Sequence, residues 1–435
     1  MSIDSDGELR REAEELRKSG KFKESQEKYT LLWEHSQRVL YGAGLLHCLR
    51  KLNDFDDALK LAHELESHCS ELNWCKTEVV WTYISGLLCK VGESEPLEKT
   101  LDIANKIMSL GPEDVALEKT VFEVLDCAKA AGDWNVVNEW VTKISPESIS
   151  SDPMKIGDGK EGWSRRAQWY NYRINSLIET DNCEDAIKIV DDILPQFPKQ
   201  RKYFVRLKAV ALHKEGKNDE SVKIYEELCR HPKADWWLLQ EYANVLRDLG
   251  KCDLSLLIYC RAAQTANKPE MMVKMVADMG FLFKNLSRNK ESLLHFLTAK
   301  FIRQDSGWKI PHEIESAINE LSVEFLVDQY PTDSKSALRQ CRELWQKETG
   351  SSNIQNIKSK QHLSGNVLLG NPEKPFCFIE SDNTESFFCY KDNLPPGIKD
   401  KMRVSFDVVP SFDKKKNRET FRATNIRILA NPSHS

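Results

Sequence analysis

The sequence predicts a mainly α protein: a right-handed solenoid of helical hairpins followed by a small five-stranded antiparallel β-barrel. Gly and Pro number only 19 and 16 among 435 residues, a scarcity that favours long uninterrupted helices. A helical pattern recurs about every 34 residues over residues 8–347. After His362 the pattern changes to short alternating runs rich in Phe, Val and Ile, which indicates strands.

The recurring unit is a turn followed by a helix with a small residue near its start. In GKCDLSLLIYCRAA, Ser255, Tyr259 and Ala262 have the i, i+4, i+7 spacing of one helix face. A second amphipathic helix precedes each turn. A short helical pair cannot bury its own apolar stripe, so neighbouring pairs must stack. The small position recurs at Ser25, Ala58, Thr100, Val137, Ala186, Ser221, Ser255, Ser292 and Ala337.

This pattern resembles the tetratricopeptide repeat family over about nine units. The resemblance implies antiparallel helix pairs whose concave groove holds a protein partner, and it predicts that Ser221, Ser255 and Ser292 lie at close helix crossings. A non-repeating helical bundle is the alternative. We expect a first tetratricopeptide-like block over residues 1–144, an interrupting surface loop over 145–163, a second block over 164–347, a linker over 348–362, a barrel over 363–430 and a tail over 431–435.

The C-terminal strands show the alternation of a small barrel. Five runs, separated by turn-rich stretches, fit the oligonucleotide-binding fold. They are NVLLGN, FCFIES, SFFCYK, MRVSFDVV and FRATNIRIL. Residues two apart on a strand leave the same face, so Phe376 shares a face with Phe378, and Phe388 shares one with Tyr390.

Two of these runs resemble the ribonucleoprotein motifs of cold-shock proteins. KPFCFI (374–379) is similar to the first motif and SFFCY (386–390) to the second. The resemblance covers residues 363–429 and implies an outer face whose exposed rings stack on bases, each contributing ~1–3 kcal/mol. The sequence departs from the family at Leu368 and Leu369, which stand where the family has a further stacking aromatic.

The candidate nucleic-acid-binding residues are the four rings and the cations that flank them. The cations are expected to meet phosphates. The region from His362 onward contains 11 Lys and Arg and 9 Asp and Glu, so its net charge is only +2. Alternatively the rings are core and the barrel docks a protein. The candidates are Lys374, Phe376, Phe378, Phe388, Tyr390, Lys391, Lys414, Lys415, Lys416 and Arg418.

Catalytic motifs are absent from the sequence. It contains no GxxxxGK[ST], HExxH or GxSxG, and no GxGxxG between a strand and a helix. We therefore expect no enzyme activity, no catalytic residues, no cofactor and no metal. His63, His68, Cys69 and Cys75 lie close in sequence without a CxxC pair, which favours structural roles over zinc. An enzyme with an unrecognised site in the solenoid groove is the remaining alternative.

The sequence predicts a cytoplasmic location and no membrane partner. No apolar run approaches the ~18 residues of a membrane span, and MSIDSDGELRREAEEL does not resemble a signal peptide. The twelve cysteines are scattered singly, as in reducing compartments.

The predicted function is a non-catalytic adaptor. Its solenoid would bind a protein partner, and its barrel would bind single-stranded RNA or DNA. This domain combination is similar to accessory proteins of bacterial conflict systems such as TOTE systems. The alternative is a pure protein scaffold in which the barrel is a docking module.

Overall fold

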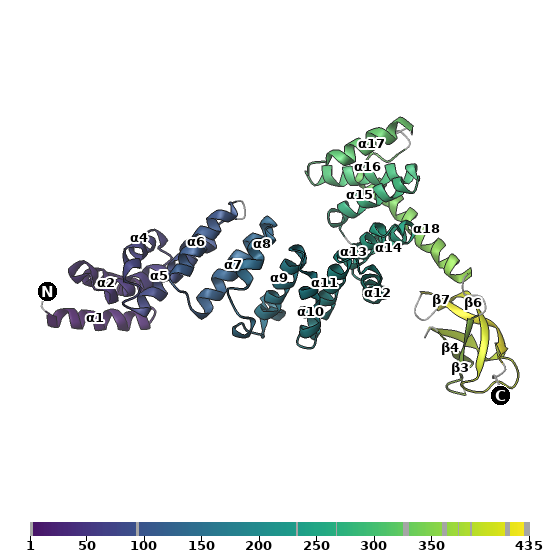
Figure 1. Cartoon of the computed structure of the whole chain (residues 1–435), viewed down its shortest axis with the longest axis horizontal. Helices are drawn as coiled ribbons and strands as arrows, with labels where there is room; N and C mark the ends of the chain where they lie inside the picture. Colours follow the sequence, from purple (N-terminus) through teal and green to yellow (C-terminus); the bar gives the residue numbers. More distant parts are fainter. Residues whose placement is uncertain are drawn as a thin grey trace. The chain divides into compact units, whose positions relative to one another are not determined.

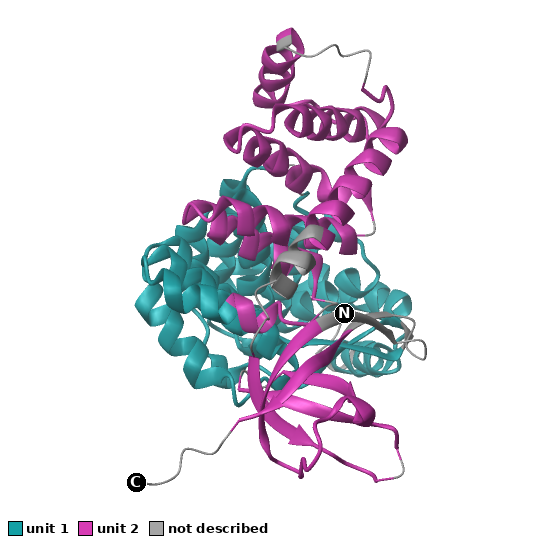
Figure 2. Ribbon diagram, turned by 90° about the vertical axis from the view of Figure 1, so that its right-hand side faces the viewer, with its two compact units in different colours: residues 1–224 teal, residues 225–435 magenta. Residues whose placement is uncertain are grey.

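The computed structural model describes residues 3–92, 95–231, 234–266, 268–324, 330–358, 363–372, 374–382, 385–413 and 418–429. The chain divides into two compact units, Met1–Ile224 and Tyr225–Ser435, which Figure 2 shows in different colours. The division falls within helix α12 (Asn218–Leu228). Each unit is described by itself.

Both units are built from helical hairpins, as Figure 1 shows, and this confirms the predicted mainly α architecture. Consecutive helices pack in pairs, for example α1 on α2 and α7 on α8. The helices of the first unit that precede α12 are α1 (Ile3–Lys18), α2 (Phe22–Ser36), α3 (Val39–Lys51), α4 (Phe55–Leu65), α5 (Asn73–Gly86), α6 (Leu97–Ser109), α7 (Asp114–Ala131), α8 (Trp134–Val141), α9 (Arg165–Glu179), α10 (Cys183–Ile193) and α11 (Arg201–Lys214).

The second unit continues the helical pairs and ends in the barrel. Helix α13 packs on α14 and α15 packs on α16. The helices after α12 are α13 (Trp236–Asp248), α14 (Cys252–Thr265), α15 (Pro269–Asn285), α16 (Asn289–Asp305), α17 (His312–Glu324) and α18 (Ser334–Lys358). Helix α18 extends through residues 348–358 of the predicted linker over 348–362. The stretch contains no Pro, and its Gln, Ile and Lys residues are compatible with a helix.

The predicted repeat register is correct. All nine small positions are at most 1% exposed, including the less regular Thr100 and Ala337. Four of them are serines whose hydroxyls donate to a carbonyl twelve residues earlier, on the preceding helix. The four bonds run from Ser25 to Ala13 (2.8 Å), from Ser221 to Ala209 (2.8 Å), from Ser255 to Ala243 (2.7 Å) and from Ser292 to Gly280 (2.8 Å).

These serines lie where two helices approach closely. A buried hydroxyl without a partner is costly, and the cross-helix carbonyl removes that cost. The facing residue is also small, either Ala or Gly. At Gly280 an added Cβ would lie 2.8 Å from the Phe296 ring, too close for a real contact. Serine is therefore tolerated in place of alanine at these crossings, because its buried hydroxyl has a hydrogen-bond acceptor.

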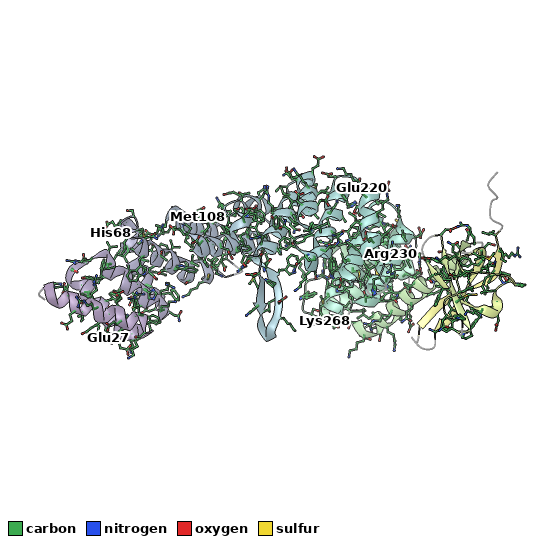
Figure 3. The ribbon with its side chains drawn as sticks, turned by 90° about the horizontal axis from the view of Figure 1, so that it is seen from below. Glu27, His68, Met108, Glu220, Arg230 and Lys268 are labelled. Atoms are coloured by element: carbon green, nitrogen blue, oxygen red, sulfur yellow. The ribbon has the colours of Figure 1, made fainter. Side chains whose placement is uncertain are left out.

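The predicted surface loop over 145–163 contains a short β-hairpin, an element that the sequence analysis did not predict. Strand β1 (Pro153–Ile156) pairs antiparallel with β2 (Lys160–Ser164), and the hairpin projects from the helices in Figure 3. Gly159 has a φ of 74° in the turn, a conformation that favours glycine. The Asp158–Gly159 dipeptide was the local signal for this turn.

The barrel is closed, with strand order β3-β4-β5-β7-β6. Its strands are β3 (Leu363–Leu368), β4 (Phe376–Ser381), β5 (Ser386–Tyr390), β6 (Arg403–Asp413) and β7 (Arg418–Ile428). The all-antiparallel prediction is wrong in one place, because β5 pairs with β7 in parallel through Phe388 and Arg422. A barrel with an odd number of strands cannot close with antiparallel neighbours alone, since the directions cannot alternate around the ring.

A buried histidine holds α18 to the preceding hairpin. The Trp345 indole donates to His295 Nε2 at 2.9 Å, and His295 Nδ1 lies 2.7 Å from the Glu291 carbonyl oxygen. Since a carbonyl only accepts, Nδ1 carries the proton and the ring is neutral. His295 is 0% exposed, and burial lowers its pKa from the usual 6.5 to about 4.

We expect Ser255→Leu to destabilise the chain by about 1–3 kcal/mol, because a larger side chain overpacks the crossing of α13 and α14. Ser255→Ala is the matched control and should cost only about 0.5–1.5 kcal/mol, the value of the lost hydrogen bond. Thermal unfolding followed by circular dichroism measures both. An unchanged melting curve for Ser255→Leu would contradict the register.

We expect the stability of the second unit to fall as pH is lowered from about 6.5 towards 4. The unfolded histidine takes up a proton in this window while the buried His295 resists it, so acid favours unfolding. Denaturant melts of wild type and His295→Gln at pH 7 and pH 5 test this expectation. The variant should lose less stability between the two pH values, and an identical loss in both proteins would contradict it.

Candidate nucleic-acid interface

Strands β4 and β5 place four aromatic rings on the outer face of the barrel. Alternation sends the residues between them inward, where they are buried in the barrel core. The inward residues are Cys377, Ile379, Phe387 and Cys389. The outward rings are Phe376, Phe378, Phe388 and Tyr390, which we call the ring cluster. Phe378 is 41% and Tyr390 45% exposed.

The rings of the cluster pack edge to face or at a tilt. Phe388 lies at the centre, with its centroid 5.5 Å from Phe376, 6.2 Å from Phe378 and 4.9 Å from Tyr390. Phe376 and Phe378 are also 6.0 Å apart. Such contacts are worth ~0.5–1.5 kcal/mol each beyond area burial, so the rings hold one another in place.

The expectation that all four rings are exposed is only partly met. Phe376 and Phe388 are half-buried, because the neighbouring rings cover their edges. The alternation in the sequence shows on which side of the strand each ring lies. It does not show how the rings of neighbouring strands pack against one another. Phe378 and Tyr390 therefore offer the most open ring surface for a ligand.

Cross-strand register brings Leu368 and Arg422 beside the cluster. Directly paired residues share a face of the sheet, and Leu368 pairs with Phe378 while Arg422 pairs with Phe388. Leu368 is thus the aliphatic neighbour of the rings, at the position where cold-shock proteins have an aromatic. Arg422 is a cation that sequence reasoning missed, because it reaches the cluster through the parallel pairing of β5 and β7.

The predicted cations have different surroundings. The Lys374 ammonium lies 5.7 Å from the Phe376 centroid, within cation–π range. The Lys391 ammonium donates to the carbonyls of Asn371 (2.7 Å) and Pro372 (3.3 Å), so it holds the loop before β4. Lys414, Lys415 and Lys416 lie outside the described residues. Arg418 is the first residue of β7.

A polar row borders the cluster on its other side. Glu380 pairs with Asn366 on β3 and with Ser386 on β5, which places all three on the outer face. Glu380 is exposed, and among the described residues its carboxylate has no hydrogen-bond or ion-pair partner. Next in that row Arg403 pairs with Asn366, and its guanidinium is 2.7 Å from the Asp382 carboxylate.

The two inward cysteines belong to the core. They face each other across β4 and β5, and burial raises the pKa of Cys389 to about 12 and raises that of Cys377. Burial thus favours the protonated thiol at both positions, which lowers their reactivity as nucleophiles.

The histidines and cysteines between residues 63 and 75 make local contacts. His63 pairs with Glu66 and His68 with Glu71, while the thiols of Cys69 and Cys75 point to the Leu65 carbonyl. In the part of the chain that the structure describes, no three His, Cys, Asp or Glu side chains gather as a metal site. None of the described helices is long and apolar enough to cross a membrane.

A comparison with protein families finds a match within the helical repeats. Residues 202–343 match a family described only as a domain of unknown function, DUF7017. No curated protein matches the sequence.

Three solved structures to which this chain is similar are the following. A tetratricopeptide repeat protein from Parabacteroides merdae is 15% identical over 74% of this chain and 99% of its own (TM-score 0.33). The complex of the TPR2AB domain of yeast Sti1 with pHSP90 is 12% identical over 74% of this chain and 100% of its own (TM-score 0.27). A Rap protein complexed with competence and sporulation factor is 10% identical over 74% and 91% (TM-score 0.37).

We expect Phe378→Ala and Phe387→Ala, only nine positions apart on the paired strands β4 and β5, to separate surface from core. Phe387 is 4% exposed, so its truncation should destabilise the barrel by about 3–5 kcal/mol. Phe378→Ala should cost far less, since its ring faces solvent. Near-ultraviolet circular dichroism and proteolysis of the barrel in the full chain measure both effects. Equal losses would show that Phe378 is part of the core.

Proposed function

We propose that this chain is a non-catalytic adaptor whose barrel binds single-stranded RNA or DNA and whose helical repeats bind a protein partner. The observation that carries the proposal is the ring cluster. Four rings stand outward from two strands whose core is filled by other residues, so packing the barrel does not require them.

An outward aromatic cluster suits unpaired bases. Every base has a flat face that stacks on an aromatic ring, whereas a duplex hides those faces inside its own stack. Lys374 lies against one ring and Arg422 lies in register with another, so positive charge is available next to the stacked bases. Phosphates that follow the bases would meet these two side chains.

The modest charge sets the expected strength of binding. The region from His362 onward has a balance of +2, and Lys391 already holds two backbone carbonyls. Few phosphates are neutralised, so the salt dependence should be shallow and stacking should supply most of the affinity.

The helical repeats support the second half of the proposal. Stacked hairpins present extended surfaces, and such surfaces generally bind proteins. The pairing of helical repeats with a cold-shock-like barrel is similar to accessory proteins of bacterial conflict systems, and we propose that role for this chain.

A protein-docking role for the barrel is the second candidate. It is favoured by the exposed apolar surface of Phe378 and Tyr390, which a protein could also cover. Binding of the full chain to oligonucleotides distinguishes the two candidates.

We expect the full chain to bind a fluorescein-labelled single-stranded oligonucleotide in low salt, and to bind the matching duplex more weakly. Phe378→Ala and Tyr390→Ala should each weaken binding by about 1–3 kcal/mol, measured by fluorescence anisotropy. Leu31→Ala, an equally exposed apolar residue on α2, is the control and should leave affinity unchanged. If the folded wild-type chain binds no oligonucleotide, the nucleic-acid proposal is wrong and the protein-docking role takes its place.

A further inference from the structure

The edges of bases stacked on the ring cluster would face specific polar groups. Phe378 and Glu380 lie two residues apart on β4 and point to the same side, about 7 Å from each other along the strand. A base lying on Phe378 therefore has one edge directed towards the Phe376 and Tyr390 rings and the opposite edge towards the row of Asn366, Glu380 and Ser386.

Glu380 is the charged member of that row. An ionised carboxylate only accepts hydrogen bonds, and its two oxygens can accept two parallel N–H groups at once. Within the described residues the Glu380 carboxylate is unpaired, although Arg403 nearby is paired with Asp382. The carboxylate is thus available to a ligand, and it repels any group that presents oxygen or another lone pair.

Among the bases, only guanine presents two adjacent N–H donors on its Watson–Crick edge, from N1 and N2. Cytosine and adenine each present one amino group beside an unprotonated ring nitrogen. Thymine and uracil present one N–H between two carbonyl oxygens, which a carboxylate repels. Single-stranded bases are commonly recognised on this edge while they stack.

We propose that the barrel selects guanine at the position stacked on Phe378, with Glu380 accepting from N1 and N2. The inference rests on the proposed nucleic-acid function and adds its base preference. A bidentate pair of this kind discriminates between bases strongly enough to give about a tenfold difference in affinity.

The test uses the full chain and fluorescein-labelled oligothymidylates about nine nucleotides long that carry one central guanine, inosine, adenine, cytosine or thymine. Matching oligouridylates form the RNA arm. Inosine keeps N1–H and lacks the N2 amino group, so it isolates one of the two bonds. Two variants are compared with wild type: Glu380→Gln, and Asp392→Asn as a control that removes one exposed negative charge after β5.

We expect wild type to bind the guanine oligonucleotide about tenfold more tightly than the thymine one, with inosine in between. Glu380→Gln should abolish this preference, whereas Asp392→Asn should retain it and shift all affinities together. Equal affinity for all five oligonucleotides, a preference for another base, or a guanine preference that survives in Glu380→Gln would overturn the inference and leave the binding function intact. No binding to any oligonucleotide would overturn the proposed function itself.

Discussion

The close approach of paired helices at one small buried residue is the constraint on which the helical part of the chain depends. At Ser25, Ser221, Ser255 and Ser292 the same hydroxyl-to-carbonyl bond spans twelve residues and joins the second helix of a pair to the first. Where the hydroxyl is absent, as at Ala58 and Ala186, the position is equally buried. Burial of this position is therefore common to the pairs, and where it is serine the hydrogen bond satisfies the buried hydroxyl.

The barrel depends on the two-residue alternation of its strands, which supplies both the buried core and the outward rings. Alternation along β4 and β5 supplies the core with Ile379 and Phe387 and supplies the outer face with Phe378 and Phe388. A shift of one residue in either strand would exchange these sets and remove both core and cluster. Stability of the fold and presentation of the rings are consequently fixed by the same register.

Local features of this chain could be predicted from sequence, and long-range ones could not. Residue size and helical spacing identified all nine small positions, and alternation identified the faces of the four rings, because both depend on near neighbours in the chain. The parallel pairing of β5 and β7 depends on barrel closure, and so does the position of Arg422. The half-burial of Phe376 and Phe388 arises from ring packing between strands. The β1–β2 hairpin lies in a stretch rich in Ser, Pro and Gly, whose composition is typical of a loop, and only the Asp158–Gly159 dipeptide indicates its turn.

The central place of Phe388 has a consequence for how the ring cluster tolerates change. Its ring touches Phe376, Phe378 and Tyr390, so each of these side chains loses rotamer freedom before any ligand arrives. Preorganised side chains lose less entropy on binding, which allows a small surface to bind with useful affinity. The same contacts couple the four positions energetically. Substitutions within the cluster will therefore not be additive, and the rings are constrained to vary together as one unit.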